Sequence, residues 1–322
     1  MNTAVPGPDP DDASFVYDEM AYFGENCAEH GLPIGDVVVE RVSHQLDDRR
    51  QISGLRWGVG EPRLVLLHGG AQNAHTWDTV ALALRPTPLL AVDLPGHGRS
   101  SWRTGSGIGP SADAEDLARA LSVLAPNAAL TVGMSLGGLT AIALTRASPR
   151  AMRLVLVDIT PGVNAEKAKA VHDFIAGPQS FPSFGEIFER TVEFNPTRSP
   201  ESLRRGILHN AHRTADGSWE WNYDRRPIAD IPDSDDGELP IEGAALWEDI
   251  SATEQPILLV RGSLSPVVGD DDVSELLRRR PDARVVVVDD AGHSVQGDRP
   301  LELAELIRAE LSRADLDATE SS

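Results

Sequence analysis

The chain has 322 residues, of which 41% are hydrophobic and 25% charged, a composition that excludes fibrous and wholly disordered proteins. Its 50 acidic residues outnumber its 29 Lys and Arg residues, giving a formal net charge of −21, so we expect no nucleic-acid partner. Cys27 is the only cysteine, which excludes an intrachain disulfide and suits a reducing compartment. Because the N-terminal residues also lack the basic and apolar regions of an export signal, we expect a cytoplasmic protein.

The negative charge is concentrated in two segments. Residues 1–30 contain seven acidic residues and residues 230–254 contain nine, and neither segment contains Lys or Arg. Prolines also recur among the first ten residues, so residues 1–30 are predicted to form an acidic, partly flexible tail. The biased segment 230–240 is predicted to be a mobile connector.

Eight short runs rich in β-branched residues predict eight strands. From the third run onward the strands are continuously apolar, which is typical of parallel strands covered on both faces. The first two runs alternate more, as expected of an edge hairpin. The predicted strands are residues 36–42, 51–57, 63–68, 88–93, 129–134, 153–158, 256–262 and 283–289.

Helical patterns lie between the parallel strands, so the fold class is α/β. The alternation is interrupted after the sixth strand by nearly a hundred residues with amphipathic helical patterns, such as 183–194 and 200–212. We therefore expect a core formed by residues 31–160 and 250–322, with residues 161–249 inserted as a helical cap. The uncharged stretch 120–145 contains Pro126, Asn127 and several glycines, so it is interpreted as a buried strand, turn and helix and not as a membrane span. The predicted core helices are residues 74–84, 111–124, 136–147, 270–279 and 300–311.

The strongest chemical signal is the sequence Gly133-Met134-Ser135-Leu136-Gly137, a G-x-S-x-G motif between a predicted strand and a predicted helix. In such an elbow the serine adopts strained backbone angles, and the glycines remove side chains that would collide. Ser135 is therefore the predicted nucleophile.

A serine hydroxyl needs a general base, and the base needs an acid to orient it. His293 follows the last predicted strand, where loops at the carboxyl ends of parallel strands converge, so His293 is the predicted base. His172, His209 and His212 fall in the predicted cap and are interpreted as surface or pocket residues.

These motifs resemble those of the α/β-hydrolase family, and the resemblance covers nearly everything after the tail. His68-Gly69-Gly70 is similar to the family's oxyanion motif, and residues 93–100 (DLPGHGRS) are similar to its loop after the fourth strand. The resemblance implies an eight-stranded, mostly parallel sheet with a cap after strand 6. It also implies that the backbone amides of Gly70 and Leu136 form the oxyanion hole. His68 and His97 are interpreted as structural residues of these loops.

The catalytic acid is where the sequence departs from the commonest family pattern. After the seventh strand, where the family usually has an aspartate, this chain has Ser265. Some family members take the acid from the end of the sixth strand, which here corresponds to Asp158. We favour Asp158, with Asp270 as the alternative, because acids at a helix start also serve as caps. Asp290 is too close in sequence to His293 to be preferred.

The constellation predicts hydrolysis of a small-molecule carboxylic ester through an acyl-enzyme intermediate. Lactones, amides, carbon-carbon bonds and perhydrolysis use the same triad in this family, and a non-catalytic binding protein of the same fold is the alternative from another class. Trp102, Trp221 and Tyr223 are candidate substrate-binding residues. The sequence has no dinucleotide or metal-ligand motif, so we expect no cofactor and no metal. We also expect no membrane partner, and a monomer or a homodimer.

Overall fold

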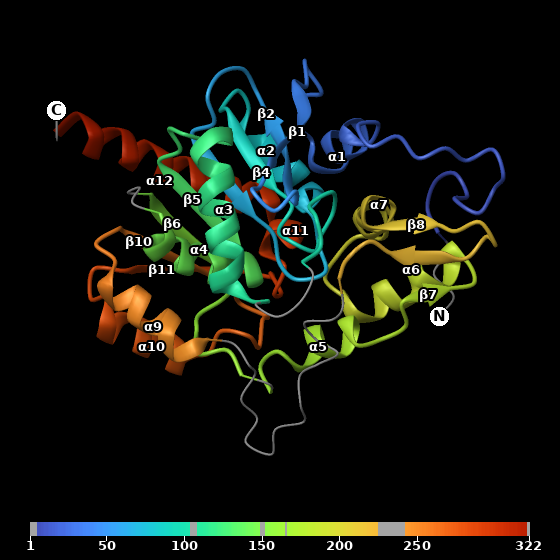
Figure 1. Ribbon diagram of the computed structural model, residues 1–322. Coiled ribbons are helices and arrows are strands. Elements are labelled where there is room, and N and C mark those ends of the chain that lie inside the picture. Colours follow the sequence, from blue (N-terminus) through green and yellow to red (C-terminus); the bar gives the residue numbers. More distant parts are fainter. Residues whose placement is uncertain (1–4, 104–107, 149–151, 165, 225–241, 321–322) are drawn as a thin grey trace.

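The computed structural model describes residues 5–103, 108–148, 152–164, 166–224 and 242–320. Its centre is an eight-stranded sheet with the order β1-β2-β4-β3-β5-β6-β10-β11 (Figure 1). The β1–β2 and β2–β4 pairs are antiparallel and the other neighbours are parallel, so the predicted sheet is confirmed. The strands are β1 (Val39–Gln45), β2 (Gln51–Trp57), β3 (Leu64–Leu67), β4 (Leu89–Val92), β5 (Leu130–Met134), β6 (Arg153–Val157), β10 (Ile257–Gly262) and β11 (Arg284–Val288).

Only the first strand departs from its predicted range by more than one residue. It begins at Val39 instead of residue 36 and continues to Gln45. The pairing from Val39 opposite Trp57 to Gln45 opposite Gln51 extends the hairpin up to the turn at residues 46–50. Cross-strand pairing, and not the apolar run before Val39, therefore sets this strand's bounds.

Helices cover both faces of the sheet (Figure 1). Successive residues of β3 alternate between the faces, with Val65 and Leu67 in one buried cluster and Leu64 and Leu66 in the other. One face is covered by α3 (Pro110–Leu124), α4 (Leu136–Ala147), α9 (Gly243–Ala252) and α10 (Asp270–Arg279); the other is covered by α1 (Phe23–His30), α2 (Asp78–Leu84) and α12 (Pro300–Glu320).

The insertion after β6 lies mostly on the right in Figure 1. Its side chains form a buried cluster of their own. A three-stranded antiparallel sheet, β7-β9-β8, accompanies its helices, so the insertion is less purely helical than expected. The reason is the short alternation Trp219-Glu220-Trp221, which buries both indoles on β9. The elements are α5 (Lys169–Ile175), β7 (Ser180–Phe181), α6 (Phe184–Phe194), α7 (Pro200–Asn210), β8 (Ala211–Arg213) and β9 (Trp219–Trp221).

The structure differs from the expected domain boundary at residue 249. This position lies inside α9, whose Leu246 and Ile250 are buried in the core cluster together with residues of α4. The whole helix therefore belongs to the core in its packing. The predicted connector 230–240 lies outside the described residues.

The N-terminal segment is more ordered than predicted for a flexible tail. Phe23 and Cys27 of α1 are buried against the sheet. Further upstream, the Asp11 carboxylate accepts hydrogen bonds from the Phe184 amide, at 2.9 Å, and from the Trp219 indole, at 2.7 Å. The acidic residues of this segment suggested a solvated tail, but Asp11 accepts hydrogen bonds from residues of the cap instead.

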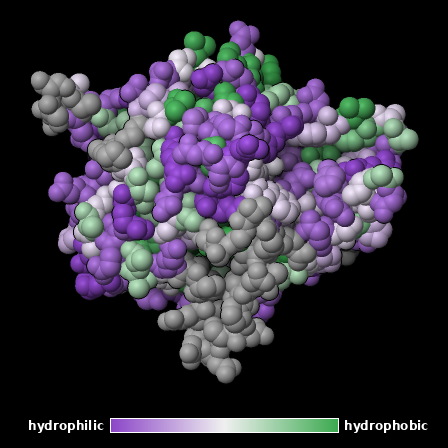
Figure 2. All heavy atoms as spheres, in the orientation of Figure 1, coloured by the Kyte–Doolittle hydropathy of each residue, from purple (hydrophilic) through white to green (hydrophobic). Residues whose placement is uncertain are grey.

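Hydrophilic residues cover most of the face shown in Figure 2, with scattered hydrophobic residues between them. None of the helices in the described ranges combines the length and apolar character needed to cross a bilayer.

Candidate active site

Ser135 lies at the turn between β5 and α4, with φ 50° and ψ −119°. This conformation is strained for a residue with a side chain. A Cβ on Gly133 would lie 2.3 Å from the Gly137 carbonyl oxygen, and one on Gly137 would lie 2.3 Å from the Leu67 carbonyl oxygen. Only glycines allow the strand to turn into the helix this tightly, as the motif predicted.

The loop after β11 places His293 beside the end of β6. His293 Nδ1 lies 2.8 Å from Oδ2 of Asp158, whose side chain is fully buried. Asp158 follows the last residue of β6 and has φ 50°, which turns its carboxylate toward the neighbouring strand β10. The geometry thus brings together the predicted base and the favoured acid.

Ser265 takes part in this arrangement through its hydroxyl. Its Oγ donates to Asp158 Oδ2, the same oxygen that faces His293, while the Gly262 amide donates to Oδ1 at 3.0 Å. The two hydrogen bonds fix the orientation of the carboxylate. In sequence, Ser265 stands where the family usually has its acid, but no sequence signal indicated that this serine donates a hydrogen bond to Asp158 at the end of β6.

The alternative acid lies elsewhere. The Asp270 side chain is 96% exposed at the start of α10, and its Oδ1 lies 2.6 Å from Arg261 Nη1. Asp290 is also exposed and pairs with Arg299. Neither carboxylate is hydrogen-bonded to His293 in the part of the chain that the structure describes.

Two backbone amides at the elbow are available to a ligand. Among the described residues, no acceptor takes the amide hydrogen of Gly70 or that of Leu136, the first residue of α4. Gly69 packs against the elbow, since a Cβ on it would lie 2.5 Å from Met134 Sδ. The loop is therefore fixed next to Ser135.

Two buried histidines hold the loops around these amides. His68 Nε2 accepts from the Leu94 amide at 2.9 Å, and His97 Nε2 accepts from the Ala71 amide at 3.1 Å. Burial lowers the pKa of both imidazoles, which keeps them neutral and able to accept these bonds. Their contacts agree with the interpretation of both as structural residues.

Two cavities meet at Ser135 and His293 between core and cap. The first, here called the apolar chamber, has a volume of about 300 Å³. The second, here called the polar chamber, has a volume of about 320 Å³. Leu139, Ile159, Val163 and Tyr223 line the apolar chamber but not the polar one, whereas Lys167, Asn195, Thr197 and Arg198 line the polar chamber but not the apolar one. Asn195 and Arg198 also line a third cavity, of about 130 Å³.

The three candidate substrate-binding aromatics have different positions. Tyr223 is buried and lines the apolar chamber. Trp221 packs within the cap cluster, with its ring centroid 5.8 Å from that of Phe174, and borders neither chamber. Trp102 is 47% exposed and also borders neither chamber. Of the three, the structure therefore brings only Tyr223 to the cavities around Ser135. His172 of the cap also lines the apolar chamber.

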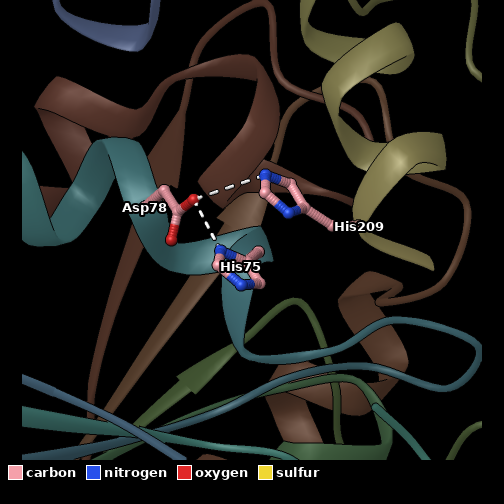
Figure 3. Close-up of side chains that lie close together, drawn as sticks. All are labelled: His75, Asp78 and His209. Atoms are coloured by element: carbon pink, nitrogen blue, oxygen red, sulfur yellow. Dashed lines mark hydrogen bonds and ion pairs between the residues drawn. The ribbon is translucent and has the colours of Figure 1, made fainter. Parts of the chain in front are cut away.

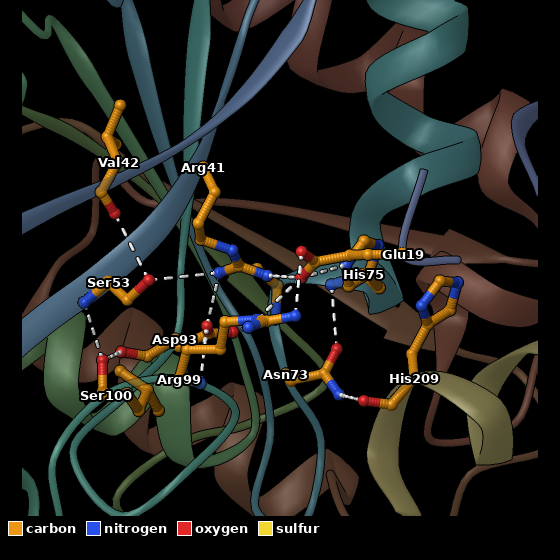
Figure 4. A network of polar contacts seen from close by, with 12 residues as sticks. Glu19, Arg41, Val42, Ser53, Asn73, His75, Asp93, Arg99, Ser100 and His209 are labelled. Carbon is orange, nitrogen blue, oxygen red and sulfur yellow. Dashed lines mark hydrogen bonds and ion pairs between the residues drawn. The ribbon is translucent and has the colours of Figure 1, made fainter. Parts of the chain in front are cut away.

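The cap is joined to the loop after β3 by amide side chains that the sequence did not reveal. Asn210 Nδ2 donates to the Ala71 carbonyl oxygen at 2.6 Å. Asn73 Nδ2 donates to the His209 carbonyl oxygen at 2.9 Å (Figure 4). Because Ala71 follows Gly70 directly, the cap helix α7 supports the loop that carries one of the free amides.

A second polar cluster lies beside this contact. His75, in the 3₁₀ turn η1 (Ala74–Trp77), and Asp78 of α2 face His209 of α7 (Figure 3). His75 Nδ1 lies 2.9 Å from Asp78 Oδ2, and His75 Nε2 lies 3.3 Å from Glu19 Oε1. Burial would lower the pKa of His75, but the Asp78 and Glu19 carboxylates overcome it and raise the pKa to about 9. His75 is therefore an imidazolium at neutral pH.

The same three side chains offer atoms within 4.8 Å of one another, as metal ligands would. The His75 and His209 rings, however, are stacked with an interplanar angle of 5° and centroids 3.8 Å apart. Lone pairs that lie in two parallel ring planes do not converge on one ion. The arrangement thus fits a hydrogen-bonded network and not a metal centre.

The chain is similar in sequence and in structure to known hydrolases. The family model described as the alpha/beta hydrolase family matches residues 64–306. Esterase Rv0045c of Mycobacterium tuberculosis is 43% identical over 310 residues, covering 94% of this chain and 98% of that protein. The 3-hydroxybutyrate-oligomer hydrolase of Cupriavidus necator is 28% identical over 259 residues, covering 77% of this chain and 88% of that protein. A solved structure of the M. tuberculosis esterase superposes with a TM-score of 0.81 at 43% identity, covering 92% of this chain and 100% of that chain.

Proposed function

The chain belongs to the alpha/beta hydrolase family, and we propose that it is a serine esterase in which Ser135, His293 and Asp158 form the catalytic triad. The observation that carries the proposal is the 2.8 Å contact between His293 and the buried Asp158, at a cavity that also exposes Ser135. The 43% identity to an esterase over nearly the whole chain supports the same reaction class.

In the proposed mechanism, His293 takes the hydroxyl proton of Ser135 through Nε2 while Asp158 holds the opposite nitrogen, Nδ1. Ser135 then attacks the ester carbonyl, and the amides of Gly70 and Leu136 stabilise the oxyanion. Removing a donor of this kind costs about 3 to 4 kcal/mol in other enzymes. The alcohol leaves with the proton from His293, and water, activated by the same base, releases the acid.

Ser265 and Gly262 donate hydrogen bonds to the Asp158 carboxylate in this mechanism. Their hydrogen bonds fix the orientation of the Asp158 carboxylate, so that it can stabilise the imidazolium that forms on His293. We assign the acid to Asp158 and not to Asp270, whose carboxylate is exposed and paired with Arg261.

Residues 161–224 supply one wall of both chambers, and we propose that this cap selects the substrate, a small molecule. We further propose a cytoplasmic location, supported by the single, buried Cys27.

The direct test is labelling with a fluorophosphonate probe, together with hydrolysis of butyl butyrate. Wild-type protein should be labelled and should turn over the ester, and Ser135→Ala should do neither. A wild-type protein that stays unlabelled at neutral pH and hydrolyses no ester would instead support a non-catalytic binding protein.

A further inference from the structure

The two chambers beside Ser135 differ in their charged groups. The apolar chamber is lined mostly by aliphatic side chains, whereas two cationic residues, Lys167 and Arg198, line the polar chamber. Arg198 lies between the polar chamber and the third cavity, which Ser202 and Gly297 also line. An ester whose carbonyl lies at Ser135 has two portions to accommodate, and the chambers offer each portion a different environment.

Lys167 already has its counter-ions. Its Nζ lies 2.7 Å from Asp272 and 2.9 Å from Asp271, two carboxylates of α10. The lysine therefore joins the cap to the core and brings little unbalanced charge to the chamber.

Arg198 is different, because its guanidinium has unused donors. Nη2 donates to Ser202 Oγ at 2.6 Å, and this is the hydrogen bond that the described residues provide to the group. Nε is buried without an acceptor. Burial lowers the pKa of Arg198, and the nearby cation Arg205 acts in the same direction. Among the described residues, the carboxylates of Asp298 and Glu29 oppose this through space, without a hydrogen bond to the guanidinium. A guanidinium carries five N–H donors, so most of its hydrogen-bonding capacity is unfilled.

The surroundings of Arg198 keep the group in this position. The guanidinium packs on Gly297, where a Cβ would lie 2.5 Å from Arg198 Cζ. Asp298 cannot turn freely toward it, because its Oδ2 accepts from the Gly292 amide at 2.7 Å and from Thr197 Oγ1 at 3.0 Å. Burying a cation without a direct partner is unfavourable, so an anion that enters the chamber gains a strong, charge-assisted contact.

We propose that Arg198 binds a carboxylate of the substrate, so that the natural ester carries an aliphatic chain on one side of the scissile bond and a carboxylate on the other. The inference rests on the proposed esterase function and assigns its substrate class. The carboxylate occupies the polar chamber against Arg198, and the aliphatic chain occupies the apolar chamber.

Two matched pairs of esters test the proposal. The butyryl esters of glycolic acid and glycolamide place the charge on the alcohol portion. Monobutyl succinate and butyl succinamate place it on the acyl portion. Within each pair the carboxylate is replaced by a neutral amide of similar size, so the ratio of the two kcat/KM values isolates charge recognition and cancels any general loss of activity.

Wild-type protein should prefer the carboxylate member of one pair by about tenfold or more, as expected for a hydrogen-bonded charge. Arg198→Gln should abolish that preference, and Arg198→Lys should retain only part of it, because an ammonium cannot pair bidentately. Lys169→Gln is the matched control, since it removes an exposed cap cation that borders neither chamber and should keep the wild-type ratio.

Equal rates within both pairs for wild type, or a preference that survives Arg198→Gln, would overturn the proposal. If Arg198→Gln is inactive on every ester, the test depends on Arg198→Lys. A carboxylate-to-amide ratio of kcat/KM in Arg198→Lys that equals the wild-type ratio would then contradict a role for Arg198 in binding the carboxylate. Failure of the esterase proposal has a separate signature, namely no hydrolysis of butyl butyrate by wild type.

Discussion

Ser265 donates its hydroxyl hydrogen to Oδ2 of Asp158, the carboxylate oxygen that also lies 2.8 Å from Nδ1 of His293. The loop after β10 and the residue after β6 thus meet at one oxygen, because the two strands are parallel neighbours in the sheet. In this arrangement the serine supports an acid contributed by the adjacent strand.

Asp158→Asn should lower kcat/KM for a neutral ester by about 10⁴-fold, because the amide cannot stabilise the imidazolium on His293. Ser265→Ala, which removes one hydrogen bond to the carboxylate, should cost about tenfold. Asp270→Asn should remain close to wild type, since that carboxylate is exposed and paired with Arg261. Steady-state kinetics on butyl butyrate gives the ranking, and a larger loss for Asp270→Asn than for Asp158→Asn would reverse the assignment.

Exchanging the residues at positions 158 and 265 tests whether the loop after β10 can also supply the acid. Asp158→Ser alone should be nearly inactive. Adding Ser265→Asp to it should recover measurable activity, because the new carboxylate starts from a side chain that already contacts the Asp158 site. If the folded double variant recovers no activity, an aspartate at position 265 does not reach His293 from the loop after β10.

The second prediction concerns the glycines of the tight elbow around Ser135. Gly137→Ala should destabilise the protein by about 2 to 5 kcal/mol and abolish activity, since its Cβ would meet the Leu67 carbonyl oxygen at 2.3 Å. Gly206→Ala is the matched control, because α7 offers open space around that position. It should stabilise the protein by about 0.5 to 1 kcal/mol. Urea unfolding of both variants measures the difference, and equal effects would contradict the steric argument.

The sheet and the elbow could be predicted from sequence because their signals are local. A continuous apolar run specifies a buried parallel strand, and the glycines around Ser135 specify a turn with no room for side chains. Strand order also brought Asp158 and His293 into consideration, since both follow parallel strands at the same edge of the sheet.

Contacts between distant segments were not predictable in the same way. The hydrogen bond from Asn210 to the Ala71 carbonyl joins a cap helix to the loop after β3, and neither residue belongs to a motif. The alternation of Trp219 and Trp221 was visible, yet three residues are too few to distinguish a strand from a loop. Acidic composition suggested a solvated tail because composition does not reveal which donors an acid will meet.

The N-terminal segment makes a third prediction. Asp11→Ala should lower the stability of the cap by about 1 to 2 kcal/mol, because it leaves the Phe184 amide at the start of α6 and the Trp219 indole without their acceptor. Asp47→Ala removes an exposed acid for comparison and should have little effect. Thermal unfolding and limited proteolysis of the cap compare the two, and identical behaviour would mean that residues 5–20 do not stabilise the cap.

The buried His75 makes the last prediction, which concerns stability against pH. Its pKa is about 9 in the folded protein, whereas an unfolded histidine has a pKa of about 6.5. The charged form is thus favoured by folding, and its contribution is fully present below about pH 6.5 and is lost as the pH rises through about 9. The difference between these values corresponds to about 3 kcal/mol. Unfolding free energies of wild type and His75→Gln, measured in urea from about pH 6 to pH 9.5, should therefore converge as the pH increases, because the imidazolium contacts with Asp78 and Glu19 disappear in the wild type alone. A gap between the two proteins that stays constant over this range would show that the charge on His75 does not stabilise the junction of core, cap and N-terminal segment.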